Sequence, residues 1–275
     1  YTITVSGSGL PKDANQIKLQ IQPDTLLDNS NNTNKATDLL VYNALIKTSA
    51  ETEATSGFLG SASSTNTKVN TIQRQNIDNV TFVDNIPSTV YDKSAKAYVD
   101  NTAWDVSEMQ DKSILAWYTT NDNGSVKVYI GSDNEIFGNY DSTYLFKSVG
   151  KADKCTSAET ITNIKLLNVS SVTNMHGMFW MTGRNAMIKL DLGDNFDTSN
   201  VTNMVCMFGE TGRVAMTTLN LGSKFDTSKV TDMSYMFNQT GYTAMTSLDL
   251  GSKFDTRSVT NMESMYQETG YTAMT

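Results

Sequence analysis

The chain is poor in the residues that carry most nucleophilic catalysis and most metal binding. It has a single histidine, His176, and only two cysteines in 275 residues. Most catalytic triads and most catalytic zinc sites need at least one histidine at a fixed place. These enzyme classes are therefore disfavoured, and only chemistry based on carboxylates stays open. We expect no enzyme activity, no metal and no cofactor.

Positive charge and long apolar runs are also scarce. The chain has 21 Lys and Arg against 29 Asp and Glu, and its basic residues form no cluster. A nucleic-acid partner is therefore disfavoured, because binding to phosphates depends on clustered basic side chains. The longest apolar runs, such as residues 39–41, are far shorter than the roughly 20 residues that a membrane span requires. We expect no membrane-spanning segment in this chain.

The C-terminal part of the chain is an internal repeat. All three prolines precede residue 88, whereas 13 of the 14 methionines follow residue 174. The sequence Phe196-Asp197-Thr198-Ser199 recurs 29 residues later and, with one change, 58 residues later. Four further columns keep this period across four copies: Met175, Met204, Met233 and Met262; Met178, Met207, Met236 and Met265; Phe179, Phe208, Phe237 and Tyr266; and Gly183, Gly212, Gly241 and Gly270.

Two periodicities alternate within each repeat. The alternation around Leu219 and Leu221 predicts a short strand over 217–221. Apolar residues then follow at helical spacing, and Gly241 suits a helix end, so the pattern predicts a short helix. The residues that give this spacing are Val230, Met233, Met236 and Phe237. The methionine columns are interpreted as core.

A repeat of this length cannot bury its apolar face alone, so the copies are expected to stack. The sequence therefore predicts an α/β fold: a leucine-rich-repeat solenoid with short parallel strands on its concave face and short helices opposite. One position departs from that template. At the position where a leucine-rich repeat carries Asn or Cys, the first of three consecutive repeats has Asn195, which fits the template. The other two have Lys224 and Lys253, which do not. We hypothesise that two threonine columns satisfy the backbone there instead: Thr198, Thr227 and Thr256, and Thr202, Thr231 and Thr260.

The repeat motif resembles a known family. The pattern Asp-Thr-Ser-x-Val-Thr-x-Met-x-x-Met-Phe at 197–208, followed by Leu-x-Leu, is similar to the BspA-like leucine-rich repeats of bacterial surface proteins and mycoplasma-type lipoproteins. The stretch before the repeats also resembles the lead-in of that family, through Trp104-Asp105-Val106-Ser107 and 142–146. The resemblance implies an extracellular or cell-surface location and adhesion to host molecules.

Three regions are predicted. Residues 1–80 form a small β-rich or mixed module, with strands at 1–5 and 17–21, a helix within 36–50 and a loop at 57–67. Residues 81–160 cap the solenoid, and residues 161–275 are the repeats. The chain ends at Thr275, in the middle of a repeat, so we expect it to be a fragment or the ordered part of a longer protein.

Several residues invite a functional reading. His176 occupies a variable position of the repeat and is assigned no role. Cys155 and Cys206 are expected to be free thiols rather than a disulfide, because their separation exceeds the reach of a bridge. Asp191, Asp194 and Asp197 suggest calcium, but they lack the EF-hand spacing and are read as loop residues.

The candidate binding surface is the outward side of the strands, where short polar side chains line up. Its columns are Lys189, Thr218 and Ser247, and Asp191, Asn220 and Asp249; aromatic contacts are predicted at Trp180, Tyr235, Tyr242 and Tyr271. Polar columns suit a glycan or a polar protein surface, although such a face can also be merely solvated.

Three functions follow from these observations. The leading one is a non-enzymatic, adhesin-like surface protein that binds host or cell-surface protein or glycan. The second is a structural subunit of an extracellular filament, surface layer or phage particle that assembles through residues 1–80. The third is a glycosidase with paired carboxylates, but no spacing of acidic residues in the sequence supports it.

Overall fold

The computed structural model describes residues 16–19, 40–43, 46–47, 72–108 and 111–274. The chain divides into two compact units, Tyr1–Leu45 and Ile46–Thr275. The first unit contains strands β1 (Gln16–Leu19) and β2 (Leu40–Asn43), which pair antiparallel. The strand predicted near 17–21 is thus confirmed by β1.

The helix predicted within 36–50 is wrong, because β2 and β3 (Ile46–Lys47) occupy that stretch. The run Leu40-Val41-Tyr42 is rich in β-branched and aromatic side chains, which favour extended backbone. The predicted strand at 1–5 and the predicted loop at 57–67 lie outside the described residues.

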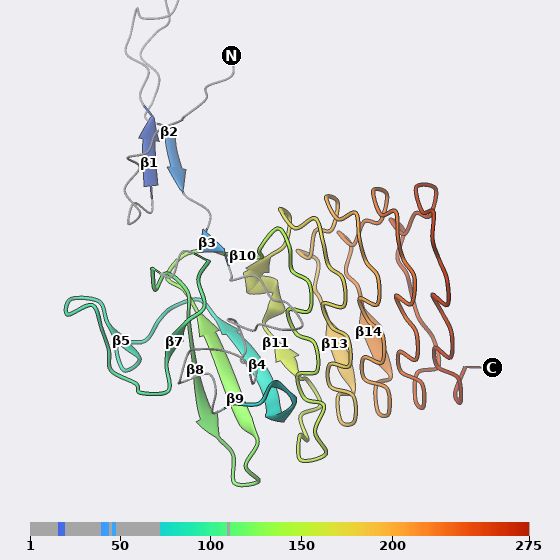
Figure 1. Ribbon diagram of the computed structural model, residues 1–275, viewed down its shortest axis with the longest axis horizontal. Helices are drawn as coiled ribbons and strands as arrows, with labels where there is room; N and C mark the ends of the chain where they lie inside the picture. The colour runs from blue at the N-terminus through green and yellow to red at the C-terminus, as the bar shows by residue number, and fades with distance from the viewer. Residues whose placement is uncertain (1–15, 20–39, 44–45, 48–71, 109–110, 275) are drawn as a thin grey trace, which may run out of the picture. The chain divides into compact units, whose positions relative to one another are not determined.

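The second unit contains a five-stranded mixed sheet in the order β11-β4-β9-β8-β7. The bounds of its strands are β4 Ile77–Val83, β7 Trp104–Asp105, β8 Leu115–Thr120, β9 Val126–Gly131 and β11 Ile161–Thr162. Strand β4 runs parallel to both β9 and β11, so this sheet leads directly into the first repeat (Figure 1). Strand β4 also spans the predicted boundary at residue 80.

Short elements complete the region before the repeats. A hairpin pairs β5 (Tyr91–Asp92) with β6 (Ala97–Tyr98). Strand β10 (Ile136–Phe137) lies between β3 and β12 (Leu167–Asn168), parallel to both. Helical turns are described only at η2 (Arg74–Asn76) and η3 (Ile164–Leu166).

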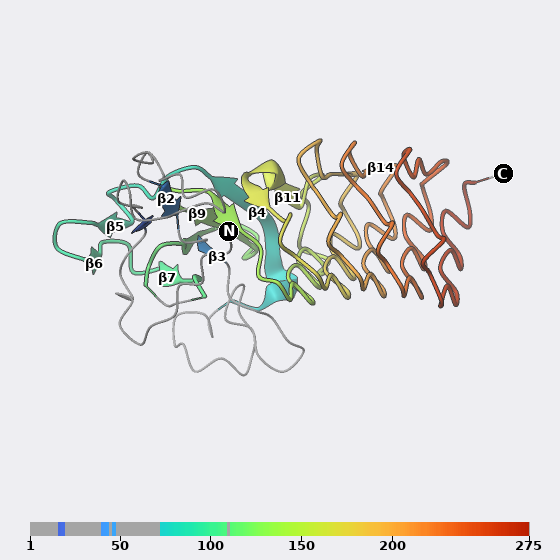
Figure 2. The same cartoon turned by 90° about the horizontal axis from the view of Figure 1, so that it is seen from above.

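The 29-residue repeats lie side by side in a fixed register. Strand β13 (Lys189–Asp191) pairs parallel with β14 (Thr218–Asn220), and the strand predicted at 217–221 is confirmed by β14. On another side of each repeat, isolated parallel bridges join equivalent residues. Figures 1 and 2 show these successive loops of chain next to one another in both views. The bridged residues are Asp141, Asn174, Asn203, Asp232 and Asn261.

The predicted fold class is wrong: the described residues form short mixed sheets and turns, with no α-helix opposite the strands. In the stretch predicted as a helix, Met236 N–H donates to Met233 at 3.1 Å, the i to i−3 bond of a turn. The N–H of Phe237 instead donates to Met265 of the next repeat, at 2.8 Å. Tyr235 has φ of +58°, which an α-helix does not tolerate.

The physical reason is that tight turns and helices bury side chains at the same spacing. Val230, Met233, Met236 and Phe237 are all fully buried, as a helical face would be. Their backbone, however, alternates between turn bonds and bonds to the neighbouring repeat. The bonds between repeats offset the roughly 1–2 kcal/mol that each left-handed residue costs.

An aromatic ladder runs through the core of the repeats. The rings of Phe146, Phe179, Phe208, Phe237 and Tyr266 stack in succession, with centroid separations of 5.4 to 5.5 Å. The two recurring methionine columns, Met175, Met204 and Met233 and Met178, Met207 and Met236, belong to the same core in the first three repeats and are fully buried, as predicted. In the last repeat, by contrast, Met262 is 50% exposed.

The threonine hypothesis is confirmed for Thr198 and Thr227. The hydroxyl of Thr227 donates to the carbonyl of Asp255 at 2.9 Å and accepts from the N–H of Asp255 at 2.7 Å. Thr198 makes the same two bonds to Asp226. The second threonine column is exposed, but its hydroxyls also donate to the carbonyl of the preceding repeat, at 3.0 to 3.2 Å.

Replacing Thr227 by valine should lower the free energy of unfolding by about 2 kcal/mol. Valine keeps the shape of the side chain but leaves the N–H and carbonyl of Asp255 without this partner. The matched control is Thr243→Val, because Thr243 is exposed and its hydroxyl makes no bond to a described residue. Urea unfolding of both variants checks the prediction, and equal midpoints would contradict it.

Candidate functional site

The structure brings together four of the six predicted polar residues. We call the outward side chains of β13, β14 and the equivalent residues of the next repeat the strand face. Lys189 lies opposite Thr218, and Asp191 lies opposite Asn220. Ser247 and Asp249 are exposed at the equivalent positions of the next repeat, where no strand is assigned. The strand face is therefore regular over two repeats.

The carboxylate of Asp191 is already bonded to other residues of the chain. Its carboxylate forms an ion pair with Lys189 at 2.9 Å and accepts from Asn220 Nδ2 at 2.9 Å and from the Gly193 N–H at 3.1 Å. The bond from Lys189 holds the pKa of Asp191 below its ordinary value and raises that of Lys189. Asn220 and Asp249 likewise accept from the N–H two residues ahead. The column of Asp191, Asn220 and Asp249 thus stabilises turns as well as facing solvent.

The three aspartates considered for calcium do not converge. Asp194 accepts from the N–H of Ser223 at 3.1 Å, and Asp197 accepts from the N–H of Ser199 at 3.0 Å. Among the residues that the structure describes, no group of three acidic, histidine or cysteine side chains is arranged to hold a metal ion.

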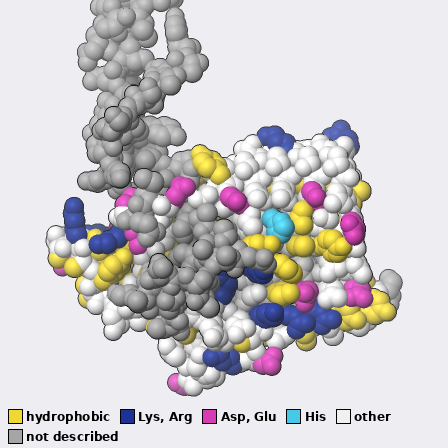
Figure 3. Space-filling view, in the orientation of Figure 1, with side chains coloured by type: hydrophobic (Ala, Val, Ile, Leu, Met, Phe, Trp, Pro, Cys, Tyr) yellow, Lys and Arg dark blue, Asp and Glu magenta, His cyan; other side chains and the backbone are white. Residues whose placement is uncertain are grey.

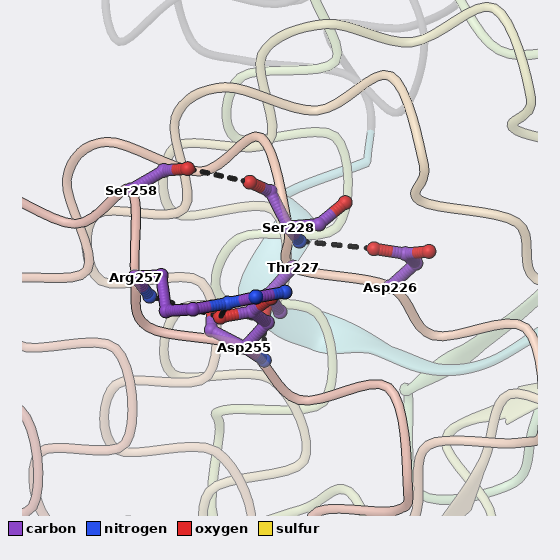
Figure 4. Close-up of polar contacts among 6 residues, drawn as sticks. All are labelled: Asp226, Thr227, Ser228, Asp255, Arg257 and Ser258. Atoms are coloured by element: carbon purple, nitrogen blue, oxygen red, sulfur yellow. Dashed lines mark hydrogen bonds and ion pairs between the residues drawn. The ribbon is translucent and has the colours of Figure 1, made fainter.

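Side-chain capping of turns recurs elsewhere in the repeats. Figure 4 shows Ser228 N–H donating to Asp226 at 2.9 Å, and the hydroxyl of Ser258 donating to the carbonyl of Ser228 at 2.8 Å. In the next repeat, Arg257 contacts Asp255 at 2.6 Å. Hydrogen bonds from Arg257 lower the pKa of Asp255 to about 2. These carboxylates are structural.

A polar pocket of about 410 Å³ lies beside the strand face. We call it the polar pocket. Asn195 and Lys224 hold the same position in consecutive repeats, and Lys165 and Asn168 flank the start of the first repeat. Glu135 directly precedes β10, which pairs with β12, and this pairing brings it to the same place. The side chains that line it include Glu135, Lys165, Asn168, Asn195, Asp197 and Lys224.

Two further hollows adjoin the polar pocket. One, of about 320 Å³, shares Glu135 and Lys165 with it and is also lined by Asp84 and Asp133. The other, of about 250 Å³, shares Lys165 and reaches Lys189 and Asp191 of the strand face. Lys165 therefore lies where three hollows meet.

Sequence reasoning did not predict the polar pocket; of its lining residues, only Asp197 was considered as a ligand, and then for calcium. The available signal was the column Asn195, Lys224 and Lys253, where lysine replaces the Asn or Cys of a leucine-rich repeat. A lysine at that position indicates an outward side chain, since lysine is almost never buried without a partner. Nothing in the sequence indicated that Glu135 and Lys165 would meet it.

Trp180 lies in an aromatic cluster with Tyr144 and His176. The ammonium of Lys147 lies 4.3 Å from the ring centres of both Tyr144 and Trp180. The hydroxyl of Tyr144 lies 3.0 Å from His176 Nε2. Figure 3 shows hydrophobic side chains gathered beside the histidine on this face of the repeats. His176 therefore has a packing role, although the sequence assigned it none.

The other predicted aromatic contacts lie in separate groups. The hydroxyl of Tyr235 donates to Glu263 at 2.8 Å. Tyr242 and Tyr271 stack with centroids 5.3 Å apart, and the guanidinium of Arg213 lies 4.4 Å from the centre of the Tyr242 ring. The four aromatic residues thus do not form one continuous platform with the strand face.

Both cysteines are free thiols, with Cys155 buried and Cys206 half-buried. Burial raises the pKa of Cys155 to about 11 and raises that of Cys206 in the same direction. Because the thiolate is the nucleophile, a raised pKa makes both thiols poorly reactive at neutral pH.

Comparison with known proteins relates the C-terminal half of the chain to a protein family. Residues 146–272 match the model of a family described as Mycoplasma protein of unknown function, DUF285. The match covers the repeats and the turn region just before them. No curated protein and no solved structure matches the chain significantly. Within the described part of the chain, no helix has the length and hydropathy needed to cross a membrane.

Proposed function

We propose that this chain is a non-enzymatic, adhesin-like binding protein of a bacterial cell surface, which binds host or cell-surface protein or glycan through its repeats. The observation that carries the proposal is the 29-residue register. It places Lys189 beside Thr218 and Asp191 beside Asn220, so an extended ligand meets polar side chains at matching positions of successive repeats.

The location outside the cell and the BspA-like character are part of this proposal. They are supported by the match of residues 146–272 to the mycoplasma family and by the resemblance of the Asp-Thr-Ser-x-Val-Thr motif to surface repeats. The motif is explained structurally by its threonine, whose hydroxyl joins neighbouring repeats.

The chemistry of the strand face supports a binding role without catalysis. A general acid or base works best with a pKa near the working pH. The pKa of Asp191 is instead lowered by Lys189, and its carboxylate is taken up by three donors. Asp249 likewise caps a turn.

The alternative function, assembly through residues 1–80, concerns a stretch of which the structure describes only a part. No contact among the described residues favours it. Sedimentation at several concentrations tests it directly, since polymerisation would favour that alternative over adhesion.

Adhesion of coated beads tests the proposal. Beads carrying residues 1–275 should adhere to cultured mammalian epithelial cells more strongly than albumin-coated beads. The variant Thr218→Glu/Ser247→Glu should reduce adhesion at least about five-fold, because two charges are added to the strand face. The control Thr243→Glu adds charge at an exposed site elsewhere in the repeat. Adhesion no stronger than that of albumin beads would refute the proposal.

A further inference from the structure

We propose that the polar pocket binds a sugar carrying one negatively charged group, such as the carboxylate of an acidic saccharide. The inference rests on the proposed function and deepens it, because it names the ligand class for the surface beside β13 and β14. It concerns a site that the sequence patterns did not indicate.

The size and lining of the polar pocket suit a small polar ligand. Its volume of about 410 Å³ falls within the 300–1,000 Å³ that is usual for small-molecule sites. Every lining side chain is polar, with two lysines, two carboxylates and two amides among them. A wholly polar wall favours a ligand rich in hydroxyl groups over an apolar one.

The two lysines and two carboxylates of the polar pocket sum to zero formal charge, but the lysines are the charged groups whose side chains have no partner within the described part of the chain. Lys165 and Lys224 are exposed, and neither ammonium forms an ion pair or hydrogen bond with a described residue. The two carboxylates, in contrast, each accept a hydrogen bond from a neutral group of the protein and keep their negative charge. Glu135 accepts from Asn168 Nδ2 at 2.7 Å, and Asp197 accepts from the N–H of Ser199 at 3.0 Å. An anionic group placed between the two lysines would gain charge-assisted hydrogen bonds.

The same carboxylates explain why the ligand is a sugar rather than a bare anion. Each carboxylate has about four lone-pair sites, so Glu135 and Asp197 can accept further hydrogen bonds after their internal ones. Sugar hydroxyls supply such donors. Inorganic sulfate supplies none, so it would face the two carboxylates with no hydrogen bond to offset their repulsion.

The adjoining hollows limit the number of charges on the ligand. The hollow that shares Glu135 and Lys165 adds Asp84 and Asp133, so its charge is predominantly negative. Asp133 is offset by Lys93 at 2.6 Å, but Asp84 and Glu135 have no such ion pair with a described residue. A longer saccharide therefore fits with neutral residues in this hollow, whereas a polyanion does not.

The test is an NMR titration of the full chain with a disaccharide of glucuronic acid and N-acetylglucosamine. Saturable binding is expected, and Lys165→Gln and Lys224→Gln should each weaken it about ten-fold, the value of one charge-assisted hydrogen bond. The matched control is Lys253→Gln, one repeat further along the same column and outside the pocket lining. It should bind like the unchanged chain.

Three further ligands decide the chemical class. The carboxyl-reduced disaccharide, sodium sulfate and a polysulfated heparin fragment should all bind at least about ten-fold more weakly. Equal binding of the neutral disaccharide would overturn the charge requirement. Equal or tighter binding of sulfate or heparin would overturn the assignment of the ligand as a sugar with one negative charge. Thermal unfolding of each variant serves as the check on folding, since exposed lysines contribute little to stability.

The outcome is separable from that of the proposed function. If the acidic disaccharide fails to bind while coated beads still adhere to cells, this inference is wrong and the adhesive function stands. If the disaccharide binds but beads do not adhere, the polar pocket is a binding site for an acidic sugar and the adhesive function is refuted.

Discussion

Replacing Phe208 by alanine should lower the free energy of unfolding by about 4 kcal/mol. Phe208 is fully buried, and its ring stacks on Phe179 and Phe237 at 5.4 Å on either side. Alanine would leave a cavity in the middle of the ladder and remove both stacking contacts. Urea unfolding followed by far-ultraviolet circular dichroism measures the change.

The matched control for Phe208 is Tyr266→Ala, at the equivalent position of the last repeat. Among the described residues, Tyr266 stacks on the ring of Phe237 alone, and it is 45% exposed, so its removal should cost about 1 to 2 kcal/mol. Equal losses in the two variants would show that the ladder adds nothing to ordinary burial, and the prediction would fail.

Replacing Gly222 by alanine should cost about 3 kcal/mol or more. Gly222 has φ of +78°, a conformation that costs a side-chain-bearing residue roughly 1 to 2 kcal/mol. An added Cβ would also overlap the backbone carbonyl of Gly193 in the preceding repeat, which is not a flexible side chain that could move away. Relieving the overlap would push two repeats apart.

Gly251→Ala separates these two effects. Gly251 lies at the same position of the next repeat with φ of +73°, but a Cβ there would meet no atom within 4 Å. Gly251→Ala should therefore lower the free energy of unfolding by only about 1 kcal/mol, the conformational cost alone. Thermal unfolding of both variants measures the difference, and a Gly222 variant as stable as the Gly251 variant would contradict the packing argument.

The buried columns of the repeat were predictable because equivalent residues recur at a fixed step. Met233, Met236 and Phe237 follow Met204, Met207 and Phe208 by 29 residues, and all six are fully buried. The role of Thr227 was predictable for a related reason, since backbone groups that are buried in successive copies need a partner in each, and threonine can supply one. Neither inference requires knowledge of the backbone path.

The polar pocket was not predictable in the same way. Lys224 belongs to the repeat, but Glu135 and Lys165 lie outside its periodic part. They reach the pocket because Ile136 pairs with Leu167. Two-residue strands such as β10 and β12 leave too little pattern in a sequence to reveal their pairing.

The sequence by itself determined the 29-residue period, the strand at β14 and the buried columns, because these depend only on which side chains recur and where. Only the tertiary structure decided between helix and turn. The spacing of Val230, Met233 and Met236 is common to both, and the choice depends on where the backbone N–H groups find partners. Here the N–H groups of Met233, Tyr235 and Phe237 donate to the next repeat, so turns replace the helix.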